Sequence, residues 1–196
     1  MSKSSKHVRQ LFCREVTASE GEDSRLISGY AVVFDTPSVV MWSEGGKAVR
    51  EQISSEAIDE ALIAGSDIRM TMFHDGQLIL ARSAYGQGTL RAGVDAHGVS
   101  FEFDAPRTVD GDKALELVRR GDIAGCSFAF CCDYSDREAV ERIEDEDGVT
   151  YIVRHIDTIL DFTLTDSPAY PDTDVSAREC CRAEVERIRR MSRRSI

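Results

Sequence analysis

Three side chains in this sequence are of the types that nucleophilic catalysis requires: His74, Ser127 and Asp161. Such catalysis needs a serine or cysteine beside a base that takes its proton, and a third group that fixes the base. His74 stands at the end of an expected strand, directly before the tight Asp75-Gly76 turn, so its side chain can project from a rigid support. A water-exposed histidine at a strand end is the plain alternative for the same pattern.

Ser127 and Asp161 are polar residues inside apolar segments. Ser127 lies in the nearly continuous apolar run 123–132, where a hydroxyl either bonds to the backbone or takes part in chemistry. The preceding Gly125 allows a backbone or a substrate to approach closely. Asp161 alternates with apolar residues, and burial of its carboxylate would need a donor such as a histidine N–H. The three residues belong to separate segments, so their spacing alone does not connect them.

The other histidines and the cysteines are weaker candidates for catalysis or metal binding. His7 lies in the basic N-terminal tip and His97 in an expected hairpin turn, so both read as surface residues. Strand neighbours point to opposite faces, which makes Cys126 a poor alternative nucleophile beside Ser127. Most of the six cysteines read as small buried apolar residues in a reducing compartment. No zinc spacing, phosphate loop or dinucleotide fingerprint occurs, so we expect no metal and no cofactor.

The elements that would hold these residues are mostly short strands. Apolar runs predict strands at 8–16, 26–34, 47–53, 67–73, 78–83, 88–94, 98–104, 123–132, 149–156 and 158–165. Helices are predicted at 54–64, after a serine cap, and at 110–120. The acidic segment 135–147 reads as a solvated face that ends in a hairpin tip. The pattern indicates an α+β fold: a mostly antiparallel sheet, closed like a β-barrel and flanked by a few helices.

Length and charge restrict the classes of partner. The 196 residues suit one domain of ordinary size, or one domain plus an appendage, and the formal net charge of −11 argues against nucleic acid as the main partner. Residues 178–196 hold seven arginines and three acids, a local charge of +4, which leaves −15 on the other 177 residues. A capping box at Ser176 opens an expected amphipathic helix. With neither a secretory signal nor a long apolar run, we expect an intracellular protein that does not bind membranes.

The order of segments resembles that of the tailed-phage prohead proteases, which are capsid-maturation serine proteases similar to herpesvirus assemblin. The match runs from Leu26 to Asp174. Its segments are GYAVVFD at 29–35, EQI at 51–53, HD at 74–75, DAHGVSFE at 95–102, RRGDIAGCSFAF at 119–130 and PAYP at 168–171. Each segment is short, and their order and spacing together are specific. The resemblance implies a herpesvirus-protease-like fold.

The resemblance also implies a role for each of the three residues. Ser127 would be the nucleophile, His74 the general base and Asp161 the acid that orients the histidine. Assemblin-like relatives use a second histidine as the third member, which keeps His155 as a rival to Asp161. Backbone N–H groups of the Ala169-Tyr170 loop would be candidates for the oxyanion hole.

The sequence departs from the family pattern at three places. Asp161 stands where the family more often has Glu, and Thr163 stands where it more often has Ser. Ala81-Arg82 stands where the family commonly shows Gly-Arg after the histidine. The first two departures fall on the segment that would supply the third catalytic member.

The function that the resemblance predicts is a serine endopeptidase that matures a procapsid from inside, in the host cytoplasm. Its substrates would be the major capsid protein and the scaffold, together with its own termini, and it would form a homo-oligomer, with a dimer as in assemblin-like relatives. Residues 1–174 would form the protease domain and 175–196 a separable basic helix. Two alternatives stay open: an inactive scaffold or capsid-assembly module of the same fold, and a nucleic-acid binder that works through the arginine-rich tail.

Overall fold

The computed structural model describes residues 6–13, 16–19 and 23–166, so the predicted tail at 175–196 lies outside the described residues. Within them the strands form three sheets. The first sheet has, in spatial order, β1 (Lys6–Cys13), β11 (Gly125–Asp133), β14 (Thr158–Thr165), β6 (Asp67–Met72), β7 (Asp75–Ala84) and β8 (Gln87–Gly88). The second sheet has β2 (Val16–Ala18), β3 (Leu26–Val33), β10 (Gly98–Asp104) and β9 (Arg91–Val94). The third sheet has β12 (Val140–Glu144), β13 (Val149–Val153), β5 (Lys47–Ile53) and β4 (Trp42–Glu44).

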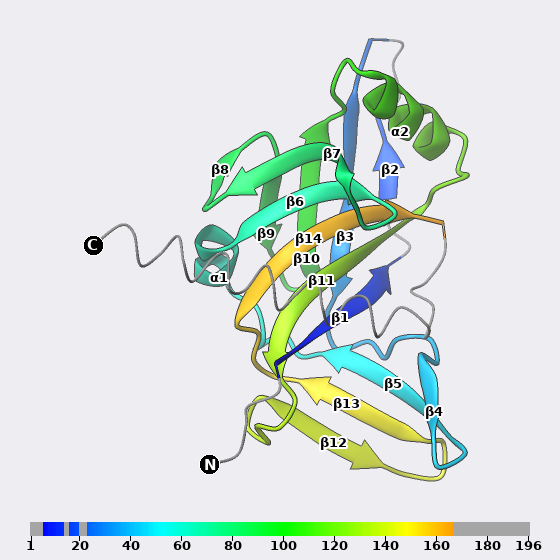
Figure 1. The fold of residues 1–196 in the computed structure, drawn as a ribbon, viewed down its shortest axis with the longest axis vertical. Helices are drawn as coiled ribbons and strands as arrows, with labels where there is room; N and C mark the ends of the chain where they lie inside the picture. Colours follow the sequence, from blue (N-terminus) through cyan, green and yellow to red (C-terminus); the bar gives the residue numbers. More distant parts are fainter. Residues whose placement is uncertain (1–5, 14–15, 20–22, 167–196) are drawn as a thin grey trace.

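The first and second sheets enclose the main core. Figure 1 shows the first sheet crossing the middle of the molecule, with the third sheet at the bottom of the view. Phe162 of β14 packs against Phe101 of β10 with ring centroids 6.2 Å apart, and Phe128 and Phe130 of β11 stack at 4.8 Å. Each buried phenylalanine stabilises the fold by about 1.5–3 kcal/mol relative to an exposed one. Because strand residues alternate between faces, the residues next to Phe128 on β11 and next to Phe162 on β14 lie on the opposite face of the first sheet.

The expected closure of the strands into a barrel is wrong for the part of the chain that the structure describes. There the sheets are open, and strand pairing in the first sheet stops at β1 and at the two-residue β8. A barrel needs a ladder of hydrogen bonds that continues around the whole sheet. The expectation of mostly antiparallel pairing is confirmed, since the described parallel pairs are β14 with β6 and β13 with β5. Alternating sequence specifies strands, but it does not specify which distant strands pair.

The second helix, α2 (Val109–Arg119), agrees with its prediction. The Thr108 side chain caps its first turn by accepting a hydrogen bond from the Gly111 N–H at 3.1 Å. Ala114, Leu115 and Val118 are buried, as their spacing predicts. This helix covers the end of the second sheet next to β2 (Figure 1).

The first helix, α1 (Glu60–Gly65), begins several residues later than predicted. The predicted serine cap forms a turn instead, because the Ser54 carbonyl accepts a hydrogen bond from the Ala57 N–H at 2.9 Å. The helix begins after Asp59, whose carboxylate accepts from the Leu62 N–H at 2.7 Å. Within this short helix, Ile63 is the buried residue.

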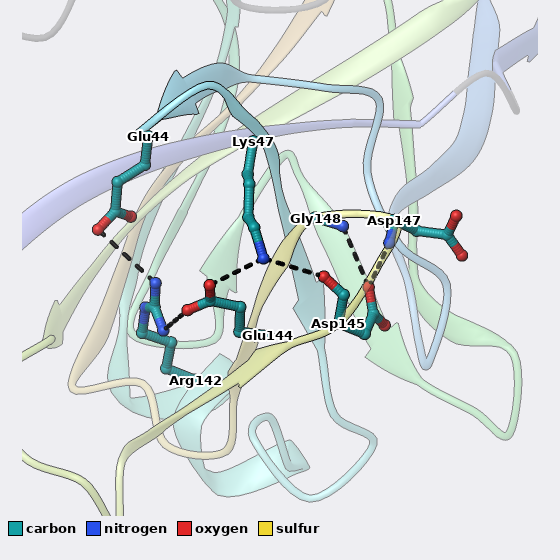
Figure 2. Close-up of polar contacts among 7 residues, drawn as sticks. All are labelled: Glu44, Lys47, Arg142, Glu144, Asp145, Asp147 and Gly148. Atoms are coloured by element: carbon teal, nitrogen blue, oxygen red, sulfur yellow. Dashed lines mark hydrogen bonds and ion pairs between the residues drawn. The ribbon is translucent and has the colours of Figure 1, made fainter.

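The acidic segment forms the outer hairpin of the third sheet and is solvated, as predicted. At its tip, the Asp145 carboxylate accepts hydrogen bonds from the N–H groups of Asp147 and Gly148 (Figure 2). Lys47 reaches Glu144 from β5 at 2.9 Å, and this hydrogen bond, with that of Arg142, holds the pKa of the Glu144 carboxyl below its usual range. Such exposed ion pairs stabilise little, about 0–1 kcal/mol each. The hairpin tip is therefore fixed mainly by the hydrogen bonds that the Asp145 carboxylate accepts from backbone N–H groups.

The start of β10 has no room for a side chain at Gly98. A Cβ at this position would lie 1.9 Å from the Val32 carbonyl oxygen on the paired strand, and a backbone atom cannot move aside cheaply. We predict that Gly98→Ala lowers the free energy of unfolding by about 1–3 kcal/mol, as overpacking does. Urea unfolding measures this change. Gly65→Ala is the matched control, because no atom lies within 4 Å of a Cβ there; equal unfolding midpoints for the two variants would contradict the prediction.

Candidate active site

Three neighbouring strands of the first sheet align a row of hydroxyl groups. β14 lies between β11 and β6, antiparallel to the former and parallel to the latter. The register pairs Ser127 with Thr163, and Thr163 with Thr71. Directly paired residues project to the same face of a sheet, so the three hydroxyls share the face opposite the core. Asp161 lies two residues before Thr163 on β14 and therefore projects to this face as well.

His74 reaches the same face from the turn that follows β6. Phe73 and His74 both adopt left-handed backbone conformations, with φ of 54° and 55°. Non-glycine residues rarely adopt this conformation, which costs about 1–3 kcal/mol for each residue. Two hydrogen bonds tie the turn to β14: the Phe73 N–H donates to the Leu164 carbonyl at 3.1 Å, and the His74 N–H donates to the Thr163 hydroxyl at 2.8 Å.

The imidazole of His74 contacts both other candidate residues. Its Nδ1 lies 3.1 Å from Asp161 Oδ1, and its Nε2 lies 3.1 Å from Ser127 Oγ. An ionised carboxylate only accepts hydrogen bonds, so Nδ1 carries the proton in this pair. A neutral imidazole then leaves Nε2 as the acceptor for the Ser127 hydroxyl. The contacts are therefore connected in the direction that draws a proton away from the serine.

The site meets solvent on the side of the histidine. Ser127 is 1% exposed, whereas the side chains of His74 and Asp161 are 21% and 22% exposed. Cys126 is fully buried within the apolar core, as strand alternation predicts. A thiol on the core face cannot replace the serine hydroxyl at His74.

The other sequence candidates lie elsewhere. His155 is exposed in the connection between β13 and β14, where its N–H donates to the Ala139 carbonyl at 3.2 Å and its carbonyl accepts from the Cys132 thiol at 3.1 Å. The side chain that contacts Nδ1 of His74 is Asp161 and not His155. The oxyanion candidates Ala169 and Tyr170 lie outside the described residues.

Sequence reasoning missed the residues that support the histidine turn. Thr71 donates a hydrogen bond to Thr163 at 2.9 Å, and both residues are at most 1% exposed. Arg82 on β7 forms two hydrogen bonds to Asp67 on β6, at 2.6 and 2.5 Å, which join the two strands at the end of β6 away from the turn. The signal available for Thr163 was the same as for Asp161, a polar residue alternating with apolar ones in a buried strand.

Neither a metal-binding cluster nor a membrane-spanning helix is found among the described residues. Within them, no group of three or more His, Cys, Asp or Glu side chains is arranged to hold a metal ion. None of the described helices is long and apolar enough to cross a membrane.

A serine, a histidine and a carboxylate connected in this order define the arrangement of a serine hydrolase. A family described as caudovirus prohead serine protease matches residues 13–188, which confirms the resemblance seen in the sequence. The chain belongs to this family, and it is a serine protease of tailed-phage capsid maturation. No curated protein and no solved structure matches the chain significantly.

The reactivity of the buried Cys132 thiol tests which face of β11 packs in the core. Burial, together with the nearby charges of Asp157 and Glu51, raises the pKa of the Cys132 thiol to about 12. The reactive thiolate is therefore scarce at pH 8, and we predict that iodoacetamide leaves Cys132 unmodified in the folded protein. Peptide mass spectrometry measures the modification, with the protein in urea as the control. Equal modification in both conditions would contradict the prediction.

Proposed function

We propose that Ser127, His74 and Asp161 are the catalytic triad of this protease, and that it cleaves the scaffold or scaffold-like segments of the major capsid protein, and itself, inside the procapsid. One observation carries the assignment of residues: the chain of contacts from Ser127 Oγ through His74 to Asp161, with both contacts at 3.1 Å. Membership of the prohead protease family supports the choice of substrates.

The proposed mechanism begins with proton transfer from Ser127 to Nε2 of His74 while the hydroxyl oxygen attacks a peptide carbonyl. Asp161 holds the imidazole in the required tautomer and stabilises it once it is protonated. His74 then gives the proton to the leaving amine, which departs and leaves an acyl-enzyme. Water, activated by the same histidine, hydrolyses the acyl-enzyme and restores the serine.

The tetrahedral intermediate needs backbone N–H donors for its oxyanion, and our candidates remain those of the Ala169-Tyr170 loop. The loss of one such donor slows catalysis by about 10²–10³-fold.

We further propose that the protease domain spans 1–174, that 175–196 is a separable basic helix for docking to acidic scaffold or to a second copy, and that the fold is herpesvirus-protease-like. Mostly antiparallel sheets, with Ser127 and Asp161 on separate strands and His74 in the turn after β6, support the last point.

Removal of the nucleophile tests the proposed function directly. When the chain is expressed with its capsid and scaffold partners, we predict that Ser127→Ala abolishes processing of both, because no hydroxyl remains to attack. The variant should also fail to react with a fluorophosphonate probe. Ser43→Ala is the matched control, since Ser43 is an exposed serine of the third sheet. Processing that continues at the normal rate in Ser127→Ala would overturn the assignment and favour an inactive assembly module.

The third member of the triad is tested by a pair of variants. We predict that Asp161→Asn lowers the rate of fluorophosphonate labelling by up to about 10⁴-fold, because an amide holds the wrong tautomer of the base. His155→Ala should label at close to the normal rate, since the hydrogen bonds of His155 within the described residues are made by its backbone. The opposite result, with His155→Ala inactive and Asp161→Asn active, would assign the role to His155.

A further inference from the structure

We infer that Thr163 is a positioning residue for catalysis: its hydroxyl, supported by Thr71, holds the backbone of His74 so that one imidazole meets both Asp161 and Ser127. The inference rests on the proposed triad and goes one step further, to what keeps the triad assembled. It concerns a group that does not touch the reacting atoms.

The hydrogen bonds of Thr163 account for both acceptor sites of its hydroxyl. A threonine hydroxyl has one donor and two acceptor lone pairs. Thr163 Oγ1 accepts from the His74 N–H at 2.8 Å and from the Thr71 hydroxyl at 2.9 Å. Thr163 is fully buried and Thr71 is 1% exposed, so water cannot take the place of either bond. Thr71 therefore fixes the hydroxyl that in turn fixes His74.

The hydrogen bond to Thr163 is made by the backbone of His74, the residue whose φ and ψ set the direction of the imidazole. The direction in which an imidazole projects depends on φ and ψ of its own residue, and His74 has φ of 55°. The bond from Phe73 to Leu164 holds the preceding peptide, whereas the bond to Thr163 holds the amide of His74 itself. Without the Thr163 acceptor, the turn is free to relax towards negative φ. The imidazole would then move away from the row of Ser127 and Asp161.

Such a displacement affects proton transfer more than binding. A shift of about 1 Å in a catalytic group can slow a reaction by about 10²-fold. Thr163 lies beneath the histidine turn and is fully buried, so it offers no surface to a substrate. Loss of its hydroxyl should therefore lower the maximal rate and leave the half-saturating concentration unchanged. A residue that served folding alone would alter neither quantity in the folded fraction.

The test uses the full chain and the rate at which a fluorophosphonate probe labels it, measured over a range of probe concentrations. We expect Thr163→Val to lower the maximal labelling rate by about 10²-fold with an unchanged half-saturating concentration. Thr163→Ser keeps the hydroxyl and should restore most of the rate. Thr158→Val, the same substitution near the start of β14, is the control and should label normally. Circular dichroism and thermal unfolding establish that each variant is folded.

Two outcomes would overturn the inference: a normal rate in folded Thr163→Val, or a rate in Thr163→Ser as low as that in Thr163→Val. Should Thr163→Val not fold, Thr71→Val decides, because it removes the support and keeps the acceptor for His74. A lower maximal rate in folded Thr71→Val supports the inference, and a normal rate overturns it. Ser127→Ala separates this failure from failure of the triad, because continued labelling in that variant would overturn the proposed function itself.

Discussion

The parallel pairing of β14 with β6 is the constraint on which the site depends. A parallel neighbour of β14 ends at the same edge of the sheet, so the chain leaves Met72 beside Leu164. The turn after β6 then begins directly next to the strand that carries Asp161 and Thr163. An antiparallel neighbour in that place would have its end at the opposite edge. The histidine turn would then lie too far from the carboxylate to contact it.

The two faces of the first sheet differ: one packs in the core, and the other carries the residues of the site. On β11 and β14, one set of alternate residues is apolar and packs in the core between the sheets, as Phe128 and Phe162 do. The other set contains the serine, the aspartate and the threonine of the site. The large apolar area on the core side keeps both strands in a single register. Because a slip of one residue would exchange the two faces, the same packing that stabilises the fold also fixes which side chains His74 can meet.

The elements near the site could be predicted from the sequence to different degrees. Most strands and the inward face of α2 follow from local periodicity and agree with the structure, whereas β4 and β12 were not predicted as strands. The family was identified from short segments in a fixed order. The start of α1 was not predictable, because Ser54 and Asp59 are both acceptable caps and tertiary packing selects between them. The barrel expectation failed because local patterns do not encode which distant edges pair. The sequence predicted the tight turn at Asp75-Gly76, but these residues belong to β7, and the turn lies at Phe73 and His74, where no glycine signals the left-handed conformation.

The resemblance in the sequence places Asp161 and Thr163 where related proteases more often have Glu and Ser, and these two differences fit together physically. An aspartate carboxylate stands one methylene closer to its strand than a glutamate carboxylate does. A histidine that bonds to Asp161 must therefore be held close to β14, and the hydrogen bond from its own amide to Thr163 holds it there. Threonine in place of serine keeps the hydroxyl that this bond uses, and the added methyl group limits the rotamers of the side chain. The shorter side chain of Asp161 and the restricted side chain of Thr163 thus have the same effect. Both leave His74 little freedom to move away from Ser127.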